Sequence, residues 1–277
     1  MVCGPTASGK SEASDALADK LSDECAAFVP TVAVDSMQVY REIPAITNQA
    51  RRRPAELVGI VPVTEAWTVA RHKARAEKII AKSTTPFVLD AGTGLYLNAI
   101  VLDVPLAPKV ESSTRRIAES LTAAEPNRRR AARAKELELA GVRDRGSIWD
   151  GEPRYDTVVV YLRPDQESLA AAIDERSERI ARDGLEEAAE IMRILASGAR
   201  VSSSVSDSIG VRELLEHLGG KITAEEARSR INTRTRQLAR SQVRWFDKLA
   251  RTLGDRVPTT VIARAQDLNT MHDIIRV

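Results

Sequence analysis

A phosphate-binding loop near the start of the sequence restricts the fold more than any other feature. Residues 3–13 read CGPTASGKSEA, in which Gly4, Gly9, Lys10 and Ser11 match the pattern G-x-x-x-x-G-K-[ST]. In that pattern a glycine-rich turn directs backbone N–H groups at an anion, and the lysine reaches the terminal phosphates. The helix that follows adds the positive end of its dipole. The loop predicts a site for a polyphosphate or diphosphate but leaves the reaction open.

The residues next to the loop support this prediction. Ser11 is expected to hold Mg²⁺ while it opens a helix, because a hydroxyl at this place is a magnesium ligand. The segment SEASDALADKL places Ala13, Leu17 and Leu21 at helical spacing. Only Met1 to Cys3 precede the loop, which is shorter than a typical strand of about five residues, so we expect the natural start to lie upstream. The expected diphosphate-binding set is Gly4, Thr6, Ala7, Ser8, Gly9, Lys10 and Ser11.

Composition argues against several other classes of protein. The 277 residues include 41 Lys and Arg against 39 Asp and Glu, so contact with nucleic acid requires a local basic surface. No apolar run approaches the roughly 20 residues of a membrane span, and we see no leader segment. We therefore expect a cytoplasmic protein with no membrane partner. Two cysteines and three scattered histidines indicate neither a disulfide framework nor a zinc site.

Short apolar runs alternate with long helical patterns. Buried strands are expected at 31–35, 56–63, 85–90 and 157–164, and helices at 67–83, 168–198 and 223–254. This alternation favours an α/β fold, a P-loop NTPase-like doubly wound parallel sheet.

A change of pattern divides the chain. Between Pro105 and Pro153 helix and turn replace the alternation, and PNRRRAARAKELELAG forms a basic helical segment. We expect 1–104 and 154–277 to form the P-loop core with C-terminal basic helices, and 105–153 to form a small helical insertion lobe. We expect the protein to be a monomer.

Polar residues follow two of the predicted strands. Asp35, in AVDSMQVYR, lies just beyond the second strand, and Thr93, in DAGTGLYLNAI, follows another. Ligands in doubly wound sheets bind beyond the carboxyl ends of the strands, so both should lie near the phosphate loop. Asp35 is predicted to be a general base, with a turn cap or a contact to a magnesium-bound water as the alternatives.

The C-terminal third is locally basic. Arg212 lies at a helix start beside Gly210, and the segment RTRQLARSQVRWFDK carries a stripe of cations at successive i+4 steps, namely Arg236, Arg240, Arg244 and Lys248. Only Asp247 is acidic between 227 and 251. Such a stripe favours a polyanionic partner, while a solvated basic face is the alternative.

Five ordered segments give the sequence its resemblance to a known family. GPTASGKS, DSMQVYR, AGTGLYL, IGVRE and RTRQLARSQVRWF together resemble the tRNA dimethylallyltransferases, also called tRNA isopentenyltransferases, from Cys3 to about Trp245. The resemblance implies transfer of a dimethylallyl group from dimethylallyl diphosphate to the N6 amine of an adenine beside the anticodon in tRNA.

The resemblance also implies roles for single residues. Lys10, the loop amides, Mg²⁺ on Ser11, and Arg212 would neutralise the departing diphosphate, while Asp35 would accept the N6 proton. Thr93 would hydrogen-bond near the diphosphate and Asp35, and serves as a third expected catalytic residue with Asp35 and Arg212. The adenine must leave its stack to reach the pocket. The expected RNA-binding set is Gln38, Arg236, Gln237, Arg240 and Arg244.

The sequence also departs from the family pattern. Val211 replaces a usual aromatic residue, Asp90 and Ala91 stand where glycines are usual, IPAITNQARRRP replaces the stretch after DSMQVYRE, and the insertion is shorter. Three alternatives therefore remain: an adenylate isopentenyltransferase acting on AMP, ADP or ATP, a P-loop kinase of small molecules with Arg128 to Arg130 in its lid, and a non-catalytic RNA-binding protein. The long cationic stripe favours tRNA, since a mononucleotide does not need it.

Overall fold

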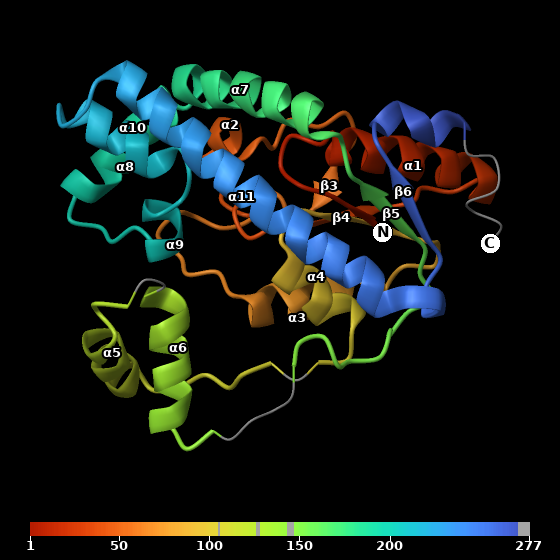
Figure 1. Ribbon diagram of the computed structural model, residues 1–277, viewed down its shortest axis with the longest axis horizontal. Helices are drawn as coiled ribbons and strands as arrows, with labels where there is room; N and C mark the ends of the chain where they lie inside the picture. The colour runs from red at the N-terminus through yellow and green to blue at the C-terminus, as the bar shows by residue number, and fades with distance from the viewer. Residues whose placement is uncertain (105, 126–127, 143–146, 271–277) are drawn as a thin grey trace.

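A six-stranded parallel sheet lies at the centre of the molecule (Figure 1). The computed structural model describes residues 1–104, 106–125, 128–142 and 147–270. The strand order is β3-β2-β4-β1-β5-β6, and every pairing between these strands is parallel. The strands are β1 (Val2–Cys3), β2 (Thr31–Val34), β3 (Ala55–Glu56), β4 (Val88–Ala91), β5 (Val159–Leu162) and β6 (Thr259–Ile262).

Helices cover both faces of this sheet, as the alternating sequence pattern predicts. They are α1 (Lys10–Cys25), α2 (Pro44–Thr47), α3 (Val69–Ile80), α4 (Gly94–Val101), α5 (Ser112–Leu121), α6 (Arg128–Leu139), α7 (Gln166–Asp183), α8 (Leu185–Ala196), α9 (Ser203–Ser206), α10 (Val211–Leu218) and α11 (Ala224–Leu253), with 3₁₀ turns η1 (Gly254–Arg256) and η2 (Ala265–Thr270). Within the described residues, no helix combines the length and the apolar character needed to cross a bilayer.

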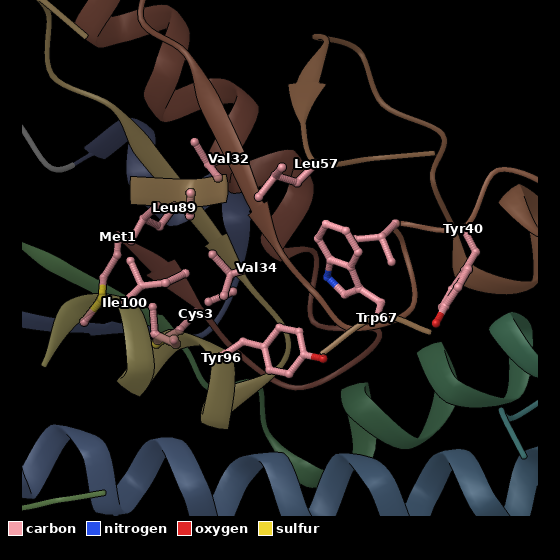
Figure 2. Close-up of a cluster of buried hydrophobic side chains, with 14 of the residues drawn as sticks. Met1, Cys3, Val32, Val34, Tyr40, Leu57, Trp67, Leu89, Tyr96 and Ile100 are labelled. Carbon is pink, nitrogen blue, oxygen red and sulfur yellow. The ribbon is translucent and has the colours of Figure 1, made fainter. Parts of the chain in front are cut away.

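Side-chain alternation along the strands divides the core in two. Val2, Val88 and Val160 face α1, where they pack with Leu17 and Leu21. The intervening strand residues face the opposite side, where α3, α4 and α11 supply a larger apolar cluster. Figure 2 shows part of this cluster, to which Val34 and Cys3 of the strands and Tyr96 of α4 all belong. Successive residues of a strand point to opposite faces of the sheet, and here both faces are covered by apolar side chains and are buried.

Two predicted elements have different limits in the structure. The expected strand 56–63 is reduced to β3, because positive φ values of 66° at Leu57 and 61° at Gly59 turn the chain out of the sheet. The expected helix 168–198 is two helices, α7 and α8, which meet at Gly184. A Cβ at Gly184 would lie 2.6 Å from the carbonyl oxygen of Ile180, so a larger residue does not fit there.

The predicted insertion forms a pair of helices. α5 and α6 pack against one another and extend below the sheet in Figure 1. The segments that enter and leave this lobe lie side by side, since Asp103 N donates to Glu152 O at 2.9 Å and Arg154 N donates to Val101 O at 2.9 Å. The division into core and lobe stays a prediction.

Candidate active site

The phosphate loop connects the central strand β1 to α1. Ala7 and Gly9 adopt positive φ values of 64° and 80°, and Gly9 is the N-cap of α1. Gly4 packs so closely that a Cβ there would lie 2.8 Å from the carbonyl oxygen of Leu162. The first N–H groups of a helix have no intrahelical acceptor, so the start of α1 offers donors for an anion, as the motif predicts. The expected loop residues therefore lie together at the carboxyl end of the sheet.

Two charged side chains meet above Gly92, which follows β4. A Cβ at this glycine would lie 2.7 Å from Asp35 Oδ2 and 3.5 Å from Lys10 Nζ. Burial lowers the pKa of Lys10, while the charges of Asp90 and Asp35 raise it. The structure thus brings the predicted base and the predicted phosphate-binding lysine to one point.

Asp35 also caps a turn. Its Oδ1 accepts hydrogen bonds from Met37 N at 2.8 Å and Gln38 N at 3.3 Å. These bonds orient the carboxylate and leave Oδ2 toward Gly92. Turn capping and the predicted chemical role are therefore compatible in this residue, because each uses a different oxygen.

Thr93 connects the two strand ends. Its Oγ1 accepts a hydrogen bond from Ser36 N at 3.1 Å and donates one to Ser36 Oγ at 3.4 Å. Since Ser36 follows Asp35 directly, Thr93 fixes the backbone that carries the carboxylate. Thr93 therefore lies beside the turn that carries Asp35 and contacts it through Ser36, while its role toward the diphosphate stays a prediction.

Ser11 contacts a second carboxylate, Asp90 of β4. Ser11 Oγ donates to Asp90 Oδ2 at 2.8 Å, and Arg51 forms an ion pair with the same carboxylate. Asp90 Oδ1 is buried without a hydrogen-bond partner among the described residues. A hydroxyl beside an incompletely satisfied carboxylate is a pair of hard oxygen donors that suits Mg²⁺. The residues present therefore fit the magnesium ion that the motif implies.

Two residues of this site were missed in the sequence. Gln242 of α11 accepts from Thr6 N at 2.8 Å and donates to Gly92 O at 2.7 Å, so it joins the phosphate loop to the turn after β4. Arg176 of α7 interacts electrostatically with Asp35, and burial lowers its pKa to about 10. Gln242 lies within RTRQLARSQVRWF, a segment that carries the family resemblance and could have drawn attention to it. Its hydrogen-bond partners are 150 and 236 residues away in the sequence, so the contacts themselves could not be inferred.

A buried histidine, His72, packs between Trp67 and Tyr96. Trp67 Nε1 donates to His72 Nδ1 at 3.1 Å, and the His72 ring lies 5.0 Å from that of Tyr96, measured between centroids. Burial lowers the pKa of His72 to about 4 against the opposing effect of Asp35. The imidazole is therefore neutral near pH 7, and it packs in the core against Trp67 and Tyr96.

The predicted catalytic residue Arg212 lies elsewhere. Arg212, on α10, has a side chain 59% exposed and pairs with Glu216 at 3.3 Å, so the structure does not bring it to the phosphate loop. The conformation of Gly210, with φ of 97°, and its N–H bond to Glu213 Oε2 at 2.9 Å give this segment a role in starting α10. Against the lowering effect of burial, the charge of Asp35 instead raises the pKa of the guanidinium of Arg176 on α7.

Gln38 also differs from its predicted role. Its side chain is buried, and Nε2 donates to Thr47 O at 3.4 Å and Asn48 O at 3.2 Å. It therefore holds the loop after Tyr40 and does not present an RNA-binding group in this structure. The reason is packing: α2 closes over the side chain.

The basic stripe on α11 is only partly available. Arg236 pairs with Asp174 at 2.6 Å and bonds Asn232 Oδ1 at 2.8 Å, which ties α11 to α7. Gln237, Arg240 and Arg244 are exposed. Among the described residues neither of these two arginines has an acidic partner, and Arg244 donates to Ser241 Oγ at 3.2 Å. Lys248 lies 4.5 Å from the centroid of the Trp149 ring. The side chains of Arg128 and Arg129 lie outside the described residues.

The family follows from comparison with known proteins. A family model described as IPP transferase matches residues 38–249, more than half of the chain. The chain belongs to the IPP transferase family. A relative from Rubrobacter xylanophilus named tRNA dimethylallyltransferase is 58% identical over 281 residues, covering 99% of this chain and 97% of that protein.

Solved structures of similar proteins agree with the IPP transferase fold. A full-length tRNA isopentenylpyrophosphate transferase from Bacillus halodurans superposes with a TM-score of 0.71 at 24% identity, over 98% of this chain and 93% of that one. A tRNA delta(2)-isopentenylpyrophosphate transferase from Staphylococcus epidermidis gives 0.67 at 22% identity, over 97% and 96%. The predicted α/β fold with a P-loop-like core and the predicted family are both confirmed.

Proposed function

We propose that this protein transfers a dimethylallyl group from dimethylallyl diphosphate to the N6 amine of an adenosine next to the anticodon in tRNA, releasing diphosphate. The observation that carries the proposal is the meeting of Lys10 and Asp35 over Gly92 at the phosphate loop. One group faces the leaving diphosphate and the other faces the attacking amine. Membership of the family and the name of the Rubrobacter relative support the same reaction.

In this reaction no bond to phosphorus is formed or broken. The N6 lone pair forms a bond to the first carbon of the prenyl group while the bond from that carbon to the diphosphate oxygen breaks, and the oxygen keeps the electron pair. Lys10 and the N–H groups at the start of α1 stabilise the charge that develops on that oxygen. Mg²⁺, held by Ser11 with Asp90, would neutralise further phosphate charge. The N6 proton passes to Asp35, whose Oδ1 bonds to Met37 and Gln38 keep the carboxylate in place.

The placement of charged and polar side chains on α11 favours tRNA as acceptor over a mononucleotide. One side of this helix reaches the phosphate loop through Gln242, and another carries the exposed Arg240 and Arg244. A polyanion lying along these arginines is thereby held by the same helix that supports the loop. A mononucleotide is too small to use such a surface, so the exposed cations distinguish the two acceptors.

The test is an acceptor panel with a prenyl-labelled donor. Purified protein, Mg²⁺ and labelled dimethylallyl diphosphate are incubated with a tRNA transcript that has adenosine beside the anticodon, the same transcript with guanosine there, AMP, or ATP. We expect label only in the first tRNA, and Lys10→Ala should abolish it. Label in AMP or ATP alone would identify an adenylate isopentenyltransferase. Transfer of phosphate from γ-labelled ATP to a small alcohol, with no prenyl transfer, would identify a kinase.

A further inference from the structure

Arg51 occupies an unusual position beside the phosphate loop. It lies in the segment after Asn48, and only 4% of its side chain is exposed. The next two residues fix this segment to α1: Arg52 N and Arg53 N both donate to Asp15 Oδ2, at 3.2 and 3.3 Å. The Arg53 side chain also donates to Val29 O at 2.9 Å. The backbone that carries Arg51 is therefore held rigidly against the helix that the phosphate loop opens.

The guanidinium of Arg51 is only partly satisfied. One terminal nitrogen pairs with Asp90 Oδ2, the oxygen that also accepts from Ser11. The other terminal nitrogen and Nε are buried and have no hydrogen-bond partner among the described residues. Burying an N–H group without an acceptor is unfavourable, and more so when the group is charged, so these donors need an acceptor. An arginine can bind two oxygens of a phosphate or carboxylate at once. The single contact with Asp90 leaves the remaining donors of Arg51 unused.

The charges around Arg51 indicate which acceptor is missing. Arg51 pairs with Asp90 on the oxygen that also accepts from Ser11, and Lys10, the residue before Ser11, lies with Asp35 over Gly92. Lys10 and Arg51 thus both lie at the mouth of the loop, beside the carboxylates Asp35 and Asp90. The unused donors of Arg51 require an acceptor, and the ligand of the loop is an anion. We propose that Arg51 binds the diphosphate directly, as a second cationic side chain beside Lys10, with Asp90 orienting the guanidinium. This inference rests on the proposed function, because it names a further ligand of the same diphosphate.

A purely structural ion pair is the competing explanation, and the two make opposite predictions. If Arg51 only stabilises the fold, removing either partner of the pair destabilises the protein and neither change alters anion affinity directly. If Arg51 binds the diphosphate, the negative charge of Asp90 neutralises part of the guanidinium charge that attracts the anion. Loss of Asp90 charge should then tighten anion binding, while loss of Arg51 should weaken it.

Equilibrium binding of inorganic pyrophosphate to the full-length protein separates these explanations. Calorimetry is carried out in EDTA, so that the contribution of Asp90 to a metal ion does not enter. The variants are Arg51→Gln, Asp90→Asn, the neutral double variant Arg51→Gln/Asp90→Asn, and Arg52→Gln. Arg52 is the matched control, because it is the neighbouring arginine, its side chain is 62% exposed and it pairs with Asp19. Thermal unfolding of each variant is measured in parallel.

We expect Arg51→Gln to raise the dissociation constant for pyrophosphate about tenfold or more, since a charge-assisted hydrogen bond is lost. Asp90→Asn should lower the constant, and Arg52→Gln should leave it unchanged. The double variant leaves no unpaired buried charge and keeps the fold, but should bind as weakly as Arg51→Gln. Wild-type affinity in the double variant, or equal values for the Arg51 and Arg52 variants, would overturn the inference alone. If wild-type protein binds no pyrophosphate, the phosphate cradle and the proposed function both fall.

Discussion

Adding one methyl group at Gly92 should slow the reaction sharply without unfolding the protein. A Cβ at this position would lie 2.7 Å from Asp35 Oδ2, 3.1 Å from Lys10 Cε and 3.5 Å from Lys10 Nζ. Ordinary contact begins near 3.4 Å, so the carboxylate oxygen must move by about 0.7 Å. Gly92→Ala therefore displaces the two groups to which we assign leaving-group stabilisation and proton acceptance.

The size of the effect follows from that displacement. A misplacement of about 1 Å in a catalytic arrangement costs on the order of 10²-fold in rate, and here both the base and the lysine are affected. The turn after β4 keeps its backbone bonds to Val34 O, at 3.2 Å from Gly92 N and 3.1 Å from Thr93 N. We therefore expect the rate constant of the chemical step to fall about 100-fold, with the melting temperature and the affinity for tRNA nearly unchanged.

The assay is single-turnover prenyl transfer with enzyme in excess over labelled donor. Gly219→Ala is the matched control, because Gly219 ends α10 with φ of −78°, an angle that alanine adopts, and lies outside the site. If the methyl acts through the base, Gly92→Ala should add little to an Asp35→Ala variant, a non-additive result that a distant effect does not give. A Gly92→Ala enzyme that transfers within threefold of the wild-type rate would refute the assigned geometry.

Three further predictions test other parts of the site. Asp35→Asn should lower the rate of transfer about 10²- to 10⁴-fold while tRNA binding in a filter assay stays constant; wild-type turnover would remove its role as base. Reversing Arg240 and Arg244 to Glu should weaken tRNA binding and flatten its dependence on salt, with the affinity for the donor unchanged; an equal slope would mean that this face is merely solvated. The free energy of unfolding should fall by about 3 kcal/mol as pH drops from 6.5 to 4, because the folded-state pKa of His72, about 4, lies below its ordinary value and the unfolded chain binds the proton first. Denaturant titration of His72→Gln should show a shallower decline.

The site residues that could be predicted from the sequence are those that follow strands of the sheet. Lys10, Asp35 and Thr93 each follow a strand of one parallel sheet, and such ends converge regardless of the loops between them. Gln242 and Arg176 come from helices that cross the sheet, and their placement depends on packing that no local pattern records. Arg212 was expected at the site because its segment carries the family resemblance. In the structure the same segment serves the start of α10, with Glu213 bonded to Gly210 and paired with Arg234.

Two departures from the family pattern are connected in space. Asp90 stands where the resemblance led us to expect a glycine, and Arg51 lies in the replaced stretch after DSMQVYRE. A buried carboxylate in the middle of the sheet is costly unless it is paired, and so is a buried guanidinium. The structure pairs each with the other, so the altered loop and the altered strand end compensate one another. The departures therefore do not argue against an active phosphate site. They place an additional cation beside the loop, where a diphosphate gains from it.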